Sequence, residues 1–264
     1  MMEKTKKSDF KILGINIWKL FVYFIFYSFL GYIIETLFAL VTMGVWECRQ
    51  SFLYGPFLGI YGVGAVVIIL FAQYFTKNNF TLFLGGYLIG SITEYIVSFG
   101  TETLIGTRWW DYSGKLLNIN GRICLLYSAF WGILTVFMIR KVNPNFDKLC
   151  IKIREKISVK VLKIVISIMM IFLAVDCIAT VYAQDQFIAR MVMEYNIPMQ
   201  EQHKFERMYN NTKKNQFLNN FINTFWDNRK MIITFPNMKI KDYNGNIIYL
   251  KDLLPDIQPY YWKK

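Results

Sequence analysis

The chain has 264 residues, of which 55% are hydrophobic and 18% aromatic, and it combines a mean hydropathy of +0.30 with a formal net charge of +12. These values lie outside the usual range of soluble globular proteins and predict an integral membrane protein.

Five apolar runs follow one another along the first two thirds of the chain, each long enough to cross roughly 30 Å of hydrocarbon as a helix. They cover residues 17–43, 57–76, 80–104, 123–140 and 161–183. We therefore expect an all-α integral membrane protein, with a bundle of about five transmembrane helices formed by residues 1–183. A cleaved signal peptide is not expected, because the first run is too long and no small-residue cleavage pattern follows it.

Lysine and arginine are distributed unevenly between the connecting segments. The N-terminal tail and the loop after the fourth run are rich in both residues, whereas the loops after the first and third runs hold few. Basic loops stay in the cytoplasm. With five spans, we expect a multi-pass protein of a bacterial cell membrane, with a cytoplasmic N-terminus and an extracytoplasmic C-terminus.

Three apolar runs each contain a carboxylate, namely Glu35, Glu94 and Asp176. A charged group costs at least a few kcal/mol inside the bilayer, so each one indicates a functional site. In the third run a series of small and acidic residues recurs at every fourth position, which puts them on one helix face: Gly86, Gly90, Glu94, Ser98 and Glu102. In the first run Ser28, Gly31 and Glu35 share a face in the same way. Such faces are expected inside a bundle.

Arginines in the two outward loops are the natural partners of these acids. We predict a polar cavity that opens to the outside and binds a ligand, lined by Glu35, Arg49, Tyr54, Glu94, Glu102, Arg108, Trp110, Asp111, Arg122 and Asp176. The alternative is that the acids and arginines form structural ion pairs that fix helix register and bind nothing. The sequence leaves both interpretations open.

The loop before the second run, FLYGPFLGIYGVGA at residues 52–65, carries Gly55, Gly59 and Gly62 with Pro56 near the start of the expected helix. Glycines at this spacing favour close helix packing, and proline is tolerated in a first helical turn. A re-entrant segment is the alternative, and it requires a backbone that is buried in protein or lines water.

The loop at residues 108–124 reads RWWDYSGKLLNINGRIC. Trp109 and Trp110 suit the membrane interface, and Asn120-Gly121 predicts a turn. Asp111 can pair with an arginine or accept from backbone donors, while Arg122 is placed to meet Glu94 or Glu102. We expect a folded lid over the outer cavity, with a simple interfacial anchor as the alternative.

Four segments together resemble the CmpB-like family of ABC-transporter type IV membrane proteins: YSFLGYIIET at 27–36, FLYGPFLGIYGVGA at 52–65, ITEYIVSFGTE at 92–102 and RWWDYSGKLLNINGRICL at 108–125. The resemblance covers about residues 20–140 and extends to the span that carries Asp176. It implies a membrane, permease-like subunit of a transport system, without catalytic residues to carry over. Tyr32, Cys48-Arg49-Gln50-Ser51 and Leu58-Gly59 depart from the family pattern around the outward mouth.

The chain holds no G-x-x-x-x-G-K-[ST] motif, so a transporter would need a separate ATPase subunit. The cytoplasmic loop at residues 140–163 is the expected docking element. Its apolar residues share one helical face: Phe146, Leu149, Cys150, Ile153 and Ile157. The same basic amphipathic helix could instead lie on anionic lipid.

Other chemistries have little support in the sequence. Cys48, Cys124, Cys150 and Cys177 form no CxxC pair, so we expect no metal and no cofactor, and a Cys48–Cys124 disulfide is left open. The single histidine, His203, is expected in solvent. Two alternatives to transport remain: a membrane scaffold or sensor that binds a partner through its outer loops and C-terminal segment, and an intramembrane enzyme acting on a lipid-linked substrate. Expected partners are the bilayer and the ATPase subunit, with homo-oligomers open and no nucleic acid.

Residues 184–264 are expected to form an appended extramembrane segment. Residues 184–228 read as helical with a break at Pro198, and MKIKDYNGNIIYL predicts a hairpin around Asn244-Gly245. We expect this segment to be too small for a large core of its own and to pack on the outer membrane face.

Overall fold

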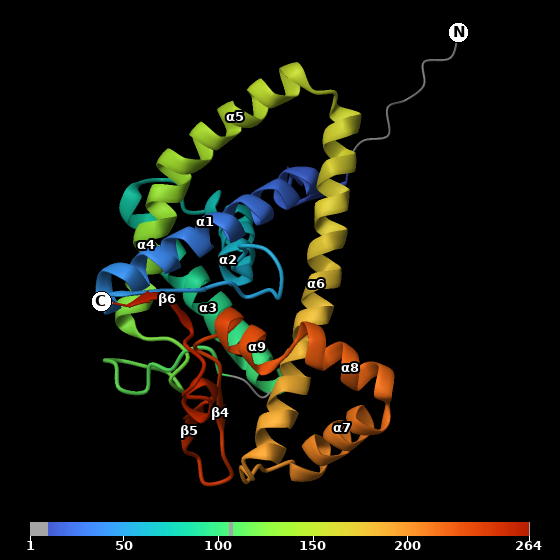
Figure 1. Cartoon of the computed structure of the whole chain (residues 1–264). Coiled ribbons are helices and arrows are strands. Elements are labelled where there is room, and N and C mark those ends of the chain that lie inside the picture. Colours follow the sequence, from blue (N-terminus) through green and yellow to red (C-terminus); the bar gives the residue numbers. More distant parts are fainter. Residues whose placement is uncertain (1–9, 106–107, 264) are drawn as a thin grey trace.

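A computed structural model describes residues 10–105 and 108–263 of the chain. Its membrane part is formed by α1 (Ile17–Met43), α2 (Gly59–Ala72), α3 (Asn79–Ile105), α4 (Leu125–Phe137), α5 (Asn143–Lys156) and α6 (Val159–Glu194). Four continuous helical stretches are long and apolar enough to cross a membrane: Ile17–Met43, Asn79–Leu104, Leu125–Lys156 and Val159–Glu194. The predicted all-α membrane fold is therefore confirmed (Figure 1).

The second predicted span is shorter than expected. α2 has 14 residues, which corresponds to only about 21 Å of helix. The backbone before it, residues 51–58, is not helical, and Pro56 lies in this loop rather than in the first helical turn. The Leu58 amide donates to the Ser28 carbonyl at 2.8 Å, so the loop reaches the middle of α1 before α2 begins. The loop after α1 lies beside the C-terminal segment, where Asn237 donates to Glu47, and the chain after α2 lies beside Arg140, which donates to the Thr76 carbonyl. The loop and α2 together therefore make the second pass through the bundle, and the loop has the backbone contact with a neighbouring helix that a re-entrant entry requires.

The fourth span and the basic amphipathic helix form one continuous rod. A π-helical stretch, Met138–Val142, joins α4 to α5, and Pro144 lies in the first turn of α5. Proline does not break the rod here because the π-helical stretch directly before it already departs from the α-helical hydrogen-bond pattern that a proline interrupts. The N-terminal half of α1 holds α5 in place, since Tyr23 donates to Asp147 at 2.6 Å and Phe26 stacks on Phe146 at 3.9 Å.

Glycines bring the helices of the bundle together. A Cβ atom at Gly62 of α2 would lie 2.8 Å from the Phe24 carbonyl of α1. A Cβ atom at Gly90 of α3 would lie 2.5 Å from that of Trp131 on α4. The small-residue faces predicted for the first and third runs are therefore the faces that contact α2 and α4, as packing between membrane helices requires.

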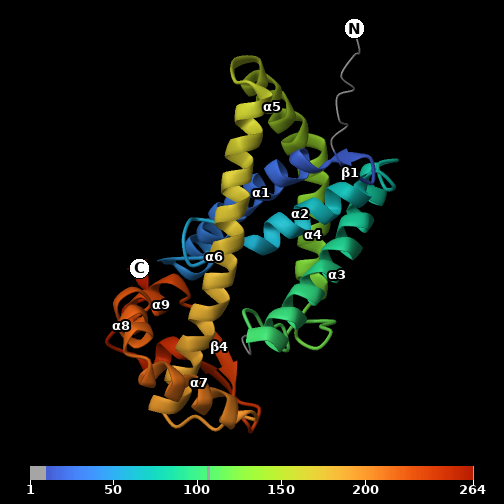
Figure 2. The ribbon, with the colours of Figure 1, turned by 90° about the vertical axis from the view of Figure 1, so that its right-hand side faces the viewer.

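α6 is too long for the membrane alone. Its 36 residues span about 54 Å against roughly 30 Å of hydrocarbon, and its C-terminal third is buried in the C-terminal segment. Figures 1 and 2 show it as a spine beside the bundle that continues into this segment. The expected start of the segment at residue 184 falls inside α6. The N-terminal hairpin, β1 (Lys11–Ile12) and β2 (Ile15–Asn16), lies at the opposite end of the molecule.

The C-terminal segment adds α7 (Gln202–Lys214), α8 (Gln216–Phe225) and α9 (Asn228–Thr234) to the end of α6. The predicted hairpin is confirmed: β4 (Lys239–Lys241) pairs antiparallel with β5 (Ile247–Tyr249), followed by a short 3-10 helix at Leu250–Leu253. The expectation that this segment is too small for a large hydrophobic core of its own was wrong. The larger of the two apolar clusters in the described residues lies here, around Phe187, Met231 and Phe235, because the end of α6 supplies a full helix face to it.

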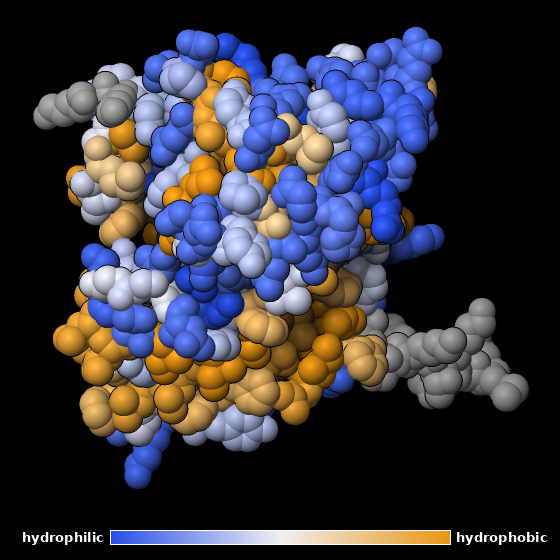
Figure 3. Space-filling model, turned by 90° about the horizontal axis from the view of Figure 1, so that it is seen from below, coloured by the Kyte–Doolittle hydropathy of each residue, from blue (hydrophilic) through white to orange (hydrophobic). Residues whose placement is uncertain are grey.

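A long-range strand pair ties the C-terminus to the bundle. β3 (Val45–Glu47), directly after α1, pairs antiparallel with β6 (Tyr260–Lys263). Figure 3, seen from the side of the C-terminal segment, shows a hydrophilic surface adjoining a continuous hydrophobic one. The hydrophobic residues exposed on the membrane helices, such as Leu88, Ile92 and Ile96 on α3, form the face expected to contact lipid.

Candidate functional site

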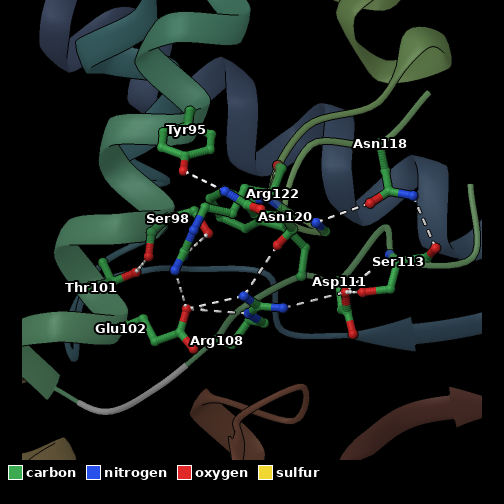
Figure 4. Close-up of polar contacts among 12 residues, drawn as sticks. Tyr95, Ser98, Thr101, Glu102, Arg108, Asp111, Ser113, Asn118, Asn120 and Arg122 are labelled. Atoms are coloured by element: carbon green, nitrogen blue, oxygen red, sulfur yellow. Dashed lines mark hydrogen bonds and ion pairs between the residues drawn. The ribbon is translucent and has the colours of Figure 1, made fainter.

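Arg122, just before α4, meets the end of α3. Its Nη2 atom lies 2.6 Å from Glu102 Oε2, and its Nη1 atom donates to Ser98 Oγ at 3.1 Å (Figure 4). The arginine is only 9% exposed, and rings of Tyr95 and Phe99 lie beside its guanidinium. Of the two acids considered as partners in the sequence, it therefore meets Glu102 and not Glu94.

Arg108 joins the same carboxylate from the other side of the loop. Its Nη2 atom lies 3.2 Å from Glu102 Oε2 and also donates to the Asn120 carbonyl at 3.3 Å. Its Nη1 atom lies 3.5 Å from Asp111 Oδ1. One chain of charges thus runs from Arg122 through Glu102 and Arg108 to Asp111, and it fixes both ends of the loop against α3.

Asp111 also organises the turn of the loop. It accepts from the Ser113 amide at 3.0 Å and from the Ser113 hydroxyl at 2.5 Å. Partial burial would raise the pKa of Asp111, but the Ser113 hydrogen bonds and the Arg108 charge outweigh it, and the pKa is lowered. Asn120 and Gly121 have positive φ values of 53° and 67°, which confirms the predicted turn.

Three aromatic residues hold the loop between the bundle and the C-terminal segment. Trp110 Nε1 donates to the Arg122 carbonyl at 2.8 Å, and the Tyr112 amide donates to the Gly121 carbonyl at 2.8 Å. Trp109 packs on Phe235 of the C-terminal segment, with ring centroids 5.7 Å apart. The loop is therefore an ordered cover between the bundle and the C-terminal segment.

Glu94 and Glu35 form a second group, inside the bundle. Glu94, 5% exposed, accepts from Tyr112 Oη at 3.0 Å and from Trp131 Nε1 at 3.2 Å. Glu35 accepts from Tyr61 Oη at 2.7 Å, and the Tyr61 and Trp131 rings lie 5.7 Å apart. Among the residues that the structure describes, no basic side chain pairs with either acid.

Sequence reasoning missed the three aromatic donors of this group. Tyr61 lies on α2 and Trp131 on α4, and Tyr112 lies in the loop. In an apolar run, the sequence does not distinguish a tyrosine or tryptophan that binds a carboxylate from one that only packs. The available signal was the hydroxyl or indole N–H group of these side chains, because a buried Tyr or Trp needs a hydrogen-bond partner and a buried carboxylate needs donors. Together with Glu35 and Glu94 they make a polar seam that joins four helices and the loop.

Asp176 and Tyr54 belong to a third group, at the loop before α2. Asp176 accepts from the Tyr54 amide at 3.1 Å, while the Leu53 amide donates to Thr180 Oγ1 at 2.7 Å. The Tyr54 hydroxyl accepts from Trp226 Nε1 at 3.3 Å. Asp176 thus binds backbone donors of the loop, and the structure does not bring it to the arginines.

Arg49 is held separately by a buried acid that sequence reasoning missed. Its Nη2 atom lies 2.6 Å from Glu47 Oε1, which also accepts from Asn237 Nδ2 at 2.9 Å. Glu47 is 1% exposed, and its position two residues before Arg49 in an otherwise uncharged loop was the available signal. The ion pair lies within the loop after α1, and the Asn237 hydrogen bond links this loop to the C-terminal segment.

Other predicted features can also be placed. All four cysteines are free thiols, and Cys48 and Cys124 are buried. Burial raises the pKa of the Cys48 thiol. In the described part of the chain, no three His, Cys, Asp or Glu side chains are grouped as metal ligands would be. Two hollows, of about 450 and 530 Å³, are lined by none of the predicted site residues.

Comparison with known proteins identifies a family. The sequence model of the family described as "Putative ABC-transporter type IV" matches residues 22–181, from α1 to the middle of α6. No curated protein and no solved structure matches the chain.

Proposed function

The chain belongs to the ABC-transporter type IV family, and from this membership we propose that it is the permease-like membrane subunit of a transport system. The membrane fold supports the proposal, since helices that cross the bilayer surround polar groups that an inert anchor does not need. We further propose that the N-terminus is cytoplasmic and the C-terminal segment extracytoplasmic. The basic ends of α1, α5 and α6 lie together, opposite the C-terminal segment, as this orientation requires (Figure 2).

The observation that carries the proposal is the polar seam of Glu35, Tyr61, Trp131, Glu94 and Tyr112. Two carboxylates lie inside the bundle with neutral donors and no cation among the described residues. Structural ion pairs would supply a cation to each, as Glu102 illustrates with two arginines. Unpaired acids at membrane depth mark the route of a cargo or ion, and we assign the seam that role.

A separate ATPase would dock on α5. This helix projects beyond the bundle at the basic end, and Leu149 and Ile153 on its apolar face are 51% and 37% exposed. Ile157, expected on the same face, lies just after the helix ends. Phe146 of the same face is covered by Phe26, so the rest of the face is held at a fixed angle to the bundle. An exposed apolar strip on an anchored helix suits a partner's groove.

The proposal is tested by purifying the tagged chain from its native host in mild detergent and identifying proteins that copurify in stoichiometric amounts. We expect an ATPase subunit, lost with Ile153→Glu and retained with the matched control Ile151→Glu, which places the same charge on the other, 56% exposed side of α5. Reproducible absence of an ATPase, or equal loss with both variants, would contradict the proposal.

A second function, a membrane sensor, is favoured by one observation. The C-terminal segment has its own apolar core and a cavity of about 450 Å³. A segment that only covered the outer end of a transport subunit would need no such cavity. Cargo uptake that depends on Glu94 separates the two functions, since a sensor would leave uptake unchanged.

A further inference from the structure

The cavity of about 450 Å³ lies among α6, α7 and α8, outside the membrane bundle. Its volume is in the range of small-molecule sites. α7 and α8 fold back against the lower end of α6 (Figure 1), and residues of all three helices line the cavity, which is open to solvent. The predicted site residues are not part of its lining, so it is a separate feature of the chain.

Its floor is polar and buried. Gln186 of α6 is 6% exposed and Thr212 of α7 is 8% exposed, and Thr212 Oγ1 donates to Gln186 Oε1 at 2.7 Å. This bond fixes the orientation of the amide. Because Oε1 is bound to Thr212, the Nε2 side of the amide is left for the cavity that Gln186 lines. The floor therefore offers an N–H group to an acceptor brought by a ligand.

Cations line one side of the cavity. Lys204 and Arg207 are three residues apart on α7, so they share a face, and in the part of the chain that the structure describes neither forms an ion pair. His203 adds a neutral or cationic donor, and Glu201 is the acid in the lining. The lining holds two cationic side chains and one carboxylate, and a second carboxylate, Asp185 of α6, lies close enough to interact with Lys204. Arg207 is therefore the cation that favours an anion, because a guanidinium recognises a carboxylate through paired hydrogen bonds.

The remaining wall is apolar, formed by the ring of Tyr182, Met208 and Leu218. We propose that this cavity binds a small amphipathic carboxylate, whose anionic end meets Arg207, Lys204 and the Gln186 amide while its hydrocarbon end lies on Met208 and Leu218. The site gives the extramembrane segment a ligand independently of any cargo that crosses the bundle.

The test uses the full chain in lipid nanodiscs and three probes: hexanoate, hexylamine and inorganic phosphate. Binding is measured by saturation-transfer NMR against empty nanodiscs. We expect saturable binding of hexanoate only. Binding of hexylamine with equal strength would show that the charges play no part, and binding of phosphate in place of hexanoate would show an anion site without an apolar half. Either outcome overturns the proposal.

Three variants locate the site. Arg207→Gln should weaken hexanoate binding by about tenfold, as expected for loss of one charge-assisted contact. Lys213→Gln, on the same helix but outside the lining, is the matched control and should bind as the parent chain does. Leu218→Trp keeps every charge and narrows the cavity, so it should abolish binding. Unchanged binding in both Arg207→Gln and Leu218→Trp would overturn the assignment.

Discussion

Arg122 reaches back to Glu102, twenty residues earlier in the chain, and places its Nη2 atom 2.6 Å from the carboxylate oxygen Oε2. The pair closes the loop at residues 108–124 onto α3, and Arg108 shares the same carboxylate at 3.2 Å. Arg122 is only 9% exposed, so the pair acts as a structural clasp. Removal of one partner would leave the charge of the other partly buried without its counter-ion.

Arg122→Gln should lower the free energy of unfolding by about 1–3 kcal/mol, because Glu102 loses its closest cation while staying shielded from solvent. Thermal unfolding of the purified protein in detergent measures the change. Lys115→Gln, which removes a cation from an exposed position of the same loop, is the control and should have little effect. An equal shift for both variants would argue against the clasp.

Asp111 predicts a dependence on pH in the acid range. Its pKa is lowered in the folded chain, so its contribution to stability is fully present above about pH 4, the ordinary value for aspartate, and is lost as the pH falls through the folded pKa. Asp111→Asn should therefore be less stable than the parent at pH 7, and the difference should shrink below about pH 4. A difference that stays constant over this range would contradict the assignment.

The spans and the hairpin could be predicted from the sequence because their signals are local. α1 covers residues 17–43 as expected from its apolar run, and Asn244-Gly245 marks the turn between β4 and β5. For α2 the expected start at residue 57 lies two residues before the observed one, and the expected end at residue 76 lies four residues beyond Ala72. The apolar run continues through both flanking segments, so hydrophobicity alone does not mark the ends of the helix.

The partners of the acids were harder to predict than their positions. Glu94 and Glu102 lie two turns apart on one face of α3, so helix periodicity cannot say which of them meets Arg122. The fold of the loop determines the pairing, because it places the Tyr112 hydroxyl at Glu94 and Arg122 at Glu102. The pairing of β3 with β6 had no local signal at all, since its two strands have three and four residues and lie far apart in the sequence.

Gly62 tests the contact between α1 and α2. Gly62→Ala should destabilise the protein by about 1–3 kcal/mol, because the added Cβ would meet the Phe24 carbonyl at 2.8 Å and the Ser28 hydroxyl as well. Gly100→Ala is the matched control, since nothing lies within 4 Å of a Cβ at this position of α3. Thermal unfolding should separate the two variants, and a Gly62→Ala protein as stable as the control would contradict the close packing.

Gln184 offers a stabilising substitution in the spine of the C-terminal segment. It is 1% exposed, and neither amide atom has a hydrogen-bond partner among the described residues. An unsatisfied buried amide costs about 1–3 kcal/mol, and methionine has a similar size and adapts to irregular space. Gln184→Met should therefore raise the melting temperature. Gln186→Met, two residues on, removes the acceptor of Thr212 and should lower it. The opposite signs distinguish an orphan amide from a general gain in hydrophobicity, because added hydrophobicity alone would move both variants in the same direction.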